Sequence, residues 1–166
     1  MFSKWLSNKT KTNLLEIASP ITGKAVELEQ VPDEAFAGKH MGEGVAIEPT
    51  EGKLIAPFDG TVAHRIDTNH ALILEHESGV QLLVHIGINT VALRGEGFTS
   101  HVSTGDKVTA GQTLIEFDIE RIKEAGYPLI TPVIIANGEE SVSAVEYRLG
   151  PVRAGDAGLL SAVLKK

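Results

Sequence analysis

Two histidines, His70 and His85, are the residues of this chain best placed to act together. They lie in the predicted strands 70–76 and 80–86, which the turn signal at 77–79 joins into a tight antiparallel hairpin. With the turn centred on residues 77 and 78, cross-strand partners sum to 155, so His70 lies directly opposite His85. The sequence therefore predicts two imidazoles side by side on one face of a hairpin.

Alternation along these strands makes the surroundings of the pair apolar, because Leu72, Leu74 and Leu83 fall on its face. A neutral imidazole, with a reference pKa of about 6.5, is nucleophilic at neutral pH without a separate base. A second imidazole can donate a hydrogen bond to a bound phosphoryl oxygen. The pair could equally be two ligands of a Zn²⁺ site that lacks its third protein ligand, or a structural contact. The spacing alone leaves these three roles open.

The elements that must position the pair are predicted to be strands. Short runs of Val, Ile and Leu, interrupted about every eight to twelve residues by Gly, Pro, Asn or Asp, indicate an all-β fold, an antiparallel β-sandwich or barrel-sandwich. The other predicted strands are 23–29, 44–48, 53–57, 60–67, 97–102, 106–108, 113–117, 130–136 and 158–164. Helical periodicity is limited to residues 32–37 and 119–125, which predicts one or two very short helices. A Pro-x-x-Gly pattern at Pro20 and again at Pro57 is compatible with duplicated hairpin units.

The length of 166 residues favours one domain, predicted at 15–166 after a flexible tail at 1–14. A hydrophobic content of 42% with 22% charged residues supplies enough apolar surface for a core. The net charge of −7 disfavours nucleic acid as a partner, and the absence of Cys excludes disulfides, thiolate catalysis and Cys-type zinc sites. No apolar run approaches the length of a membrane span or an export signal, so we expect a cytoplasmic protein.

The tail has a composition of its own. Its large apolar residues fall near one helical face and its lysines add positive charge; they are Met1, Phe2, Trp5 and Leu6, with Lys4, Lys9 and Lys11. Residues 1–11 could therefore make a weak contact with the inner face of a membrane. A frayed tail is the alternative, because so short a helix is marginal in water.

Residues 79–91, which read GVQLLVHIGINTV, resemble the phosphorylation-site signature of the glucose-family IIA proteins of the bacterial phosphoenolpyruvate-dependent sugar phosphotransferase system. The similarity covers most of residues 16–137. Further matching segments are 31–33, Phe36, 44–50, 56–61, 68–71, 93–98, 115–118 and 131–133.

This resemblance implies a β-sandwich that carries a phosphoryl group on Nε2 of His85, with His70 stabilising it. It further implies that Thr68 orients His70, and that the backbone carbonyl of Gly87 fixes the Nδ1 proton of His85. In the family, the phosphoryl group arrives from the phosphocarrier protein HPr and leaves to a Cys of a sugar-specific IIB domain of the IIB/IIC permease. Members also bind regulatory target proteins. No cofactor is required, although members bind Zn²⁺ through the two histidines when a partner adds a carboxylate.

The residues predicted to meet partners are Asp33, Phe36, Leu72, Leu83 and Asn89. Leu83 and Ile66 stand where the family often has Phe. Asn89 stands where the family has Asp, and the loss of an acidic group there weakens the attraction for a basic docking face.

Two other functions compete with this one. Residues 105–114 are similar to the final hairpin of biotinyl and lipoyl carrier domains, but the lysine motif that such domains carry at a hairpin tip is missing. A zinc hydrolase would use the two histidines with Asp33 or another carboxylate as third ligand. The remaining histidines, His40, His64, His76 and His101, are assigned to surface or loop positions.

Overall fold

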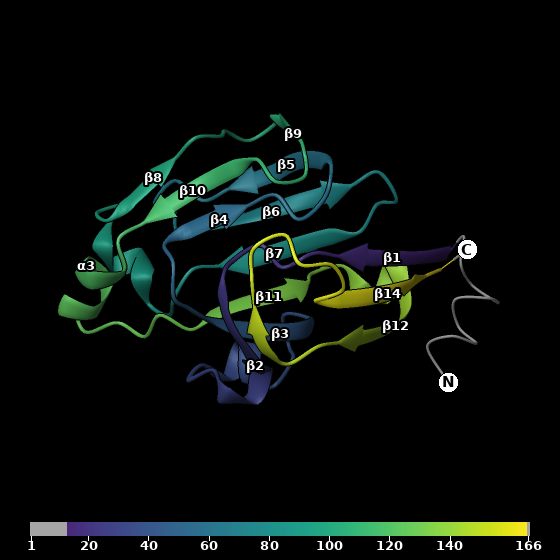
Figure 1. The fold of residues 1–166 in the computed structure, drawn as a ribbon, viewed down its shortest axis with the longest axis horizontal. Coiled ribbons are helices and arrows are strands. Elements are labelled where there is room, and N and C mark those ends of the chain that lie inside the picture. Colours follow the sequence, from purple (N-terminus) through teal and green to yellow (C-terminus); the bar gives the residue numbers. More distant parts are fainter. Residues whose placement is uncertain (1–12, 166) are drawn as a thin grey trace.

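The computed structural model describes residues 13–165, whose antiparallel strands are arranged in three sheets (Figure 1). The largest sheet has eight strands, which are in spatial order β13 (Gly150–Val152), β2 (Gly23–Glu27), β3 (Glu43–Pro49), β11 (Thr131–Ile135), β7 (Gln81–His85), β6 (Ala71–His76), β5 (Gly60–Arg65) and β9 (Lys107–Val108). One three-stranded sheet has the order β4 (Lys53–Ile55), β10 (Thr113–Phe117) and β8 (Phe98–Ser100). The other has the order β1 (Leu14–Ile17), β14 (Leu160–Leu164) and β12 (Val142–Tyr147). The predicted all-β antiparallel fold is confirmed.

Every predicted strand is present with small shifts at its ends, but the sequence prediction missed β1, β12 and β13. Strand β13 contains Pro151, which argues against a central strand, and it indeed lies at the edge of the eight-stranded sheet. Strand β1 begins at Leu14, which pairs with Val163. The predicted tail of 1–14 is therefore too long at its end. Residues 1–12, with the predicted membrane contact of 1–11, lie outside the described residues.

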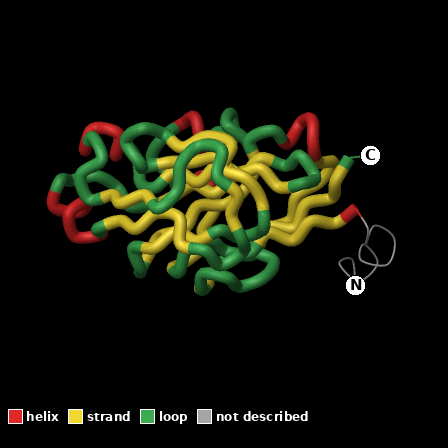
Figure 2. Tube along the Cα trace, turned by 90° about the horizontal axis from the view of Figure 1, so that it is seen from above, coloured by secondary structure: helices red, strands yellow, loops and turns green. Residues whose placement is uncertain are grey.

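The short helices lie at the margins of the strands (Figure 2). Both predicted helices form, as α2 (Glu34–Ala37) and α3 (Ile119–Glu124). The prediction of one or two helices was too low, because the structure adds α4 (Gly138–Ser141) and the 3₁₀ turns η2 (Leu28–Gln30) and η3 (Thr90–Leu93). No helix among residues 13–165 is long and apolar enough to cross a membrane.

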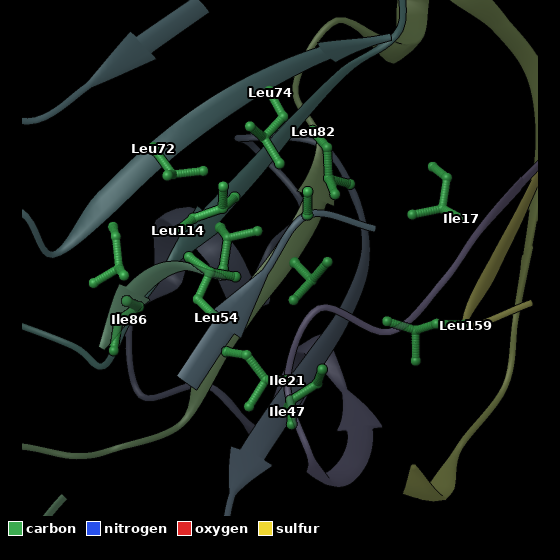
Figure 3. Packing of buried hydrophobic residues seen from close by; sticks show 14 of the residues in the cluster. Ile17, Ile21, Ile47, Leu54, Leu72, Leu74, Leu82, Ile86, Leu114 and Leu159 are labelled. Atoms are coloured by element: carbon green, nitrogen blue, oxygen red, sulfur yellow. The ribbon is translucent and has the colours of Figure 1, made fainter. Parts of the chain in front are cut away.

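The eight-stranded sheet has an apolar cluster on each of its faces. The larger one, the main core, packs residues of all three sheets together, among them Leu54, Leu72 and Leu114 (Figure 3). Strand alternation sends the intervening residues to the other face, where a second cluster forms. This outer cluster consists of Leu28, Val31, Phe36, Ala46, Ala71, Leu83, Ile88, Ile130 and Ile134. Segment 28–37, with η2 and α2, thus covers the outer face, and the histidine pair lies on that face.

Candidate functional site

The β6–β7 hairpin carries the histidine pair, but its register differs by one residue from the predicted one. Ala71 is the cross-strand partner of His85, where the prediction placed His70. The amide of His76 bonds to the carbonyl of Val80, so the loop has three residues, 77–79. Gly79, at φ 94°, occupies the left-handed position that such a loop requires. The prediction assumed a two-residue turn, and the extra loop residue accounts for the shift.

A shift of one residue moves side chains to the other face of a strand. Leu72 and Leu74 are therefore fully buried in the main core, where Leu74 lies beside Leu82 (Figure 3). The prediction that Leu72 contacts partners was wrong for this reason. Leu83 does share the face of His85, but it is only 8% exposed and belongs to the outer cluster. It is a packing residue beneath the site.

The two histidines meet in spite of the different register. His70 lies just before the first residue of β6, where strand alternation no longer sets its direction, and it follows Asn69 in the left-handed region at φ 62°. The ring centroids of His70 and His85 lie 4.9 Å apart, with the rings edge to face at 78°. The backbone amide of Ile86 donates to the carbonyl of His70 at 2.7 Å, which ties the two strand ends together. His70 is buried and His85 half-buried.

The hydrogen bond of His85 defines where its proton lies. Nδ1 of His85 is 2.8 Å from the carbonyl oxygen of Gly87, which can only accept, so Nδ1 carries the proton. Burial lowers the pKa of His85, and this is partly opposed by the bond to Gly87 and by the negative charge of Asp33. The ring is therefore neutral at neutral pH. Its Nε2 then holds a free lone pair, as a nucleophile must.

The second ring is held from the other side. Nδ1 of His70 lies 2.6 Å from the hydroxyl of Thr68, which can donate or accept. Burial, together with the neighbouring His85, lowers the pKa of His70 to about 4. His70 is thus also neutral at neutral pH, and in the tautomer that accepts from Thr68 it presents an N–H at Nε2.

The surroundings of the pair include three of the predicted partner residues. Asp33 caps helix α2 by accepting from the amide of Ala35 at 2.9 Å, and its carboxylate acts on the pKa of His85. The ring of Phe36 packs on His85 with centroids 5.2 Å apart, but Phe36 is buried, so it offers little exposed docking area. Asn89 is exposed in the loop after His85, at φ 64°, directly before η3.

Three further residues of the site, Thr90 and Val91 in this loop and Thr131 at the start of β11, were not predicted from the sequence. Val91 in η3 is apolar and 54% exposed. Thr90 and Thr131 are fully buried and bind the backbone beside Gly87: the hydroxyl of Thr90 donates to the carbonyl of Ile86 at 2.6 Å, and the amide of Gly87 donates to the hydroxyl of Thr131 at 3.3 Å. A threonine inside an apolar segment was the available signal, because a buried hydroxyl needs a partner.

The competing functions find less support. Among the described residues, no group of three or more His, Cys, Asp or Glu could hold a metal ion, so Asp33 does not complete a three-ligand zinc site. Lys107 lies within β9, paired with Thr61, and not at a hairpin tip. His40 and His64 are exposed, as predicted.

The two other histidines also lie apart from the pair. His101 is exposed and bonds Glu116 at 2.7 Å. His76 is half-buried, and its ring packs against Phe58 with centroids 5.1 Å apart.

The chain is similar to known proteins both in sequence and in fold. Residues 15–141 match the family described as phosphoenolpyruvate-dependent sugar phosphotransferase system, EIIA 1. The glucose-specific EIIA component of Bacillus cereus is 44% identical over 143 residues, which are 86% of this chain and 87% of the relative. That of Borreliella burgdorferi is 45% identical over 151 residues, 91% of this chain and 79% of the relative. The solved structure of glucose permease IIA from Mycoplasma capricolum superposes with a TM-score of 0.81 at 32% identity, covering 89% of this chain and 95% of that one.

Proposed function

The chain belongs to the EIIA 1 family of the phosphoenolpyruvate-dependent sugar phosphotransferase system, and we propose that it carries a phosphoryl group on Nε2 of His85. The donor is the phosphorylated form of HPr, and the acceptor is a cysteine of a sugar-specific IIB domain. One observation carries the proposal: the bond from His85 to the carbonyl of Gly87 leaves the Nε2 lone pair free beside a second imidazole.

The transfer needs no oxidant, metal or net proton. The Nε2 lone pair of His85 attacks the phosphorus of phospho-HPr, an N–P bond forms, and the N–P bond of the donor breaks with its electron pair returning to the donor imidazole. In the second step a cysteine thiolate of IIB attacks the same phosphorus. The bond to Nε2 then breaks, and His85 recovers its lone pair.

His70 stabilises the transferred group in this proposal. With its Nδ1 accepting from the Thr68 hydroxyl, its Nε2–H is free to donate to a phosphoryl oxygen. The low pKa of His70 keeps this group neutral before phosphoryl transfer, so it neither repels a basic donor nor needs to lose a proton. Hydrogen bonds to the charge that develops in the transition state are a large part of phosphoryl-transfer catalysis.

The surface that partners meet is proposed to centre on the exposed part of the loop after His85 and on Asp33. Asn89 and Val91 are its exposed members, and Asp33 gives it negative charge beside the reactive ring. Because the relatives named above are glucose-specific, glucose is the sugar we propose first. We place the reaction in the cytoplasm with no resident cofactor, and Zn²⁺ binding by His70 and His85 with a partner's carboxylate is a separate proposal.

Phosphorylation by the purified general enzymes tests the function. The chain, phosphoenolpyruvate, the general phosphotransferase enzyme and HPr are incubated, and intact mass is measured at neutral pH; we expect an adduct of roughly 80 Da, one phosphoryl group. His85→Gln should abolish it. His101→Gln, which changes an exposed histidine paired with Glu116, should leave it unchanged. An undiminished adduct on His85→Gln would contradict the assignment.

A further inference from the structure

The two peptide groups on either side of Gly87 are each held at both ends. In the group that joins residues 86 and 87, the carbonyl of Ile86 accepts from Thr90 at 2.6 Å and the amide of Gly87 donates to Thr131 at 3.3 Å. In the next group, the carbonyl of Gly87 accepts from Nδ1 of His85 at 2.8 Å, and the amide of Ile88 donates to the carbonyl of Pro128 at 3.0 Å.

The directions of the two threonine bonds are fixed by counting protons. Each hydroxyl has one proton to donate. Thr90 gives its proton to the carbonyl of Ile86, and Thr131 gives its proton to the carbonyl of Leu129 at 2.8 Å, so Thr131 can only accept from Gly87. Both side chains are fully buried, where water cannot replace them.

Gly87 is the point at which this backbone could turn. It lies at φ 71°, and a glycine passes between positive and negative φ at little cost. Another residue type could not restrict the backbone here, because a Cβ at this position would lie 2.7 Å from Cγ2 of Thr90 and 2.8 Å from the carbonyl oxygen of Pro128. The bonds around Gly87 must therefore hold the carbonyl that faces His85. Pro128 holds the peptide group that carries this carbonyl, and Thr90 and Thr131 hold the peptide group before it.

We propose that Thr90 and Thr131 are positioning residues for the transfer. By holding the peptide group before Gly87, they keep the next carbonyl pointing at Nδ1 of His85, and thereby keep the proton on Nδ1 and the lone pair on Nε2. This inference rests on the proposed function, in which Nε2 of His85 is the nucleophile.

A purely structural role would look different in an experiment. Ser19 offers the comparison, since its hydroxyl is also fully buried and bonds a backbone carbonyl, that of Ile21 at 2.7 Å, in the loop after β1. Removing such a hydroxyl lowers the melting temperature and nothing else. Removing a positioning hydroxyl also changes the proton placement on His85.

The test uses Thr131→Val, Thr90→Val and the control Ser19→Ala in the full chain labelled with ¹⁵N-histidine. The ¹⁵N shifts of the His85 ring give its tautomer at neutral pH, and single-turnover mixing with phospho-HPr gives the acceptance rate. We expect wild type and Ser19→Ala to hold the proton on Nδ1. The two valine variants should show mixed tautomers and accept the phosphoryl group roughly tenfold more slowly, the lower end of the loss found when the partners that orient metal-binding histidines are removed.

Serine and alanine replacements keep the test decisive where valine prevents folding. Thr131→Ser and Thr131→Ala both lose the methyl group, and only the alanine variant loses the hydroxyl, so serine should retain the wild-type tautomer and rate. The inference is overturned if folded variants that lack the Thr90 hydroxyl or the Thr131 hydroxyl keep the wild-type tautomer of His85, even when their melting temperature is lower. A wild-type chain that accepts no phosphoryl group from HPr overturns the proposed function instead, while the tautomer measurement still judges the positioning role.

Discussion

At the residue scale, the two rings of the pair are both neutral but hold their protons for different purposes. His85 is fixed with its proton on Nδ1 by a carbonyl, whereas Thr68 leaves His70 free to present an N–H at Nε2. One ring is thus prepared to attack and the other to donate. Substitutions of His70 should separate the two half-reactions.

We expect His70→Gln to accept the phosphoryl group from HPr and to pass it on to IIB more slowly, by roughly a hundredfold, because a misplaced donor stabilises the developing charge little better than a missing one. Glutamine keeps a donor of similar reach but not the geometry of the imidazole Nε2–H. Rapid-quench measurements of each half-reaction give the two rates. Equal losses in both half-reactions would show that His70 has no separate role in onward transfer.

The low pKa of His70 also predicts how stability depends on pH. Its pKa is about 4 in the folded chain and about 6.5 when unfolded, so between these values the unfolded chain binds more protons. The contribution of His70 to the free energy of unfolding is then fully present above pH 6.5. It is lost as the pH decreases toward 4, and the loss is on the order of 3 kcal/mol. The lowered pKa of His85 acts in the same direction.

Urea unfolding at a series of pH values, with a chelator present to exclude zinc, measures this slope. His70→Gln should flatten it between pH 6.5 and 4. His64→Gln, at an exposed position of β5, should leave it as in the wild type. The pKa assignment fails if the slopes of the wild type and His70→Gln coincide.

At the element scale, two glycines with positive φ act in the hairpin and in the loop that follows it. Gly79 at φ 94° has no atom within 4 Å of an added Cβ, whereas Gly87 at φ 71° has two within 3.0 Å. Gly79→Ala should cost about 1 kcal/mol from backbone strain alone and leave phosphoryl transfer intact. Gly87→Ala should cost more and also slow acceptance, because the carbonyl that orients His85 must move.

Denaturant unfolding and single-turnover acceptance, measured on both alanine variants, check this pair. For the same loss in the free energy of unfolding, Gly87→Ala should lose far more of its phosphoryl-acceptance rate than Gly79→Ala. A proportional loss in the two variants would indicate that only stability matters.

Some of this local structure was predictable from the sequence and some was not. The runs of Val, Ile and Leu predicted the hairpin and its two histidines, since a strand pattern survives small changes of register. The loop of three residues could not be told from one of two, because Gly79 fits either, and this single residue moved Leu72 into the main core. Strand β13 contains a proline, so predicting it would have required knowing which strand lies at the edge of the sheet. The support from Thr131 depends on a contact between distant segments, whereas Thr90 bonds a carbonyl only four residues before it.

At the scale of the whole molecule, the site lies over a packed apolar cluster. The burial of each residue therefore determines how far an introduced charge lowers the melting temperature. Leu83→Asp should lower the melting temperature strongly, because the carboxylate would be buried in the outer cluster. Val91→Asp, at a position 54% exposed, should melt as the wild type does. Val91→Ser, which removes the same apolar contact without adding charge, should weaken binding to the partners. Circular dichroism melting beside titration with HPr distinguishes them, and an unchanged melt for Leu83→Asp would return that residue to the docking surface.

Charge also acts across the whole molecule, which carries a net −7. Asn89→Asp adds an acidic group to the exposed loop beside the pair, and the left-handed backbone there accepts Asp as well as Asn. Association with a basic partner should become about threefold faster at low salt and lose the gain at high salt.

Stopped-flow association rates at two ionic strengths test this expectation. Gln112→Glu adds the same charge near β9, three strands from β7 in the sheet order, and should change the rate little. An equal acceleration by both variants would mean that net charge alone guides the encounter.

The eight-stranded sheet separates what keeps the chain folded from what a partner touches. Its inner face belongs to the main core, and the exposed loop residues on the far side, such as Asn89 and Val91, belong to neither apolar cluster. Mutations that retune recognition there carry little folding penalty, so such positions are free to drift during evolution while the strands beneath stay constant. Related chains can in this way share one fold and differ in the partners that they bind.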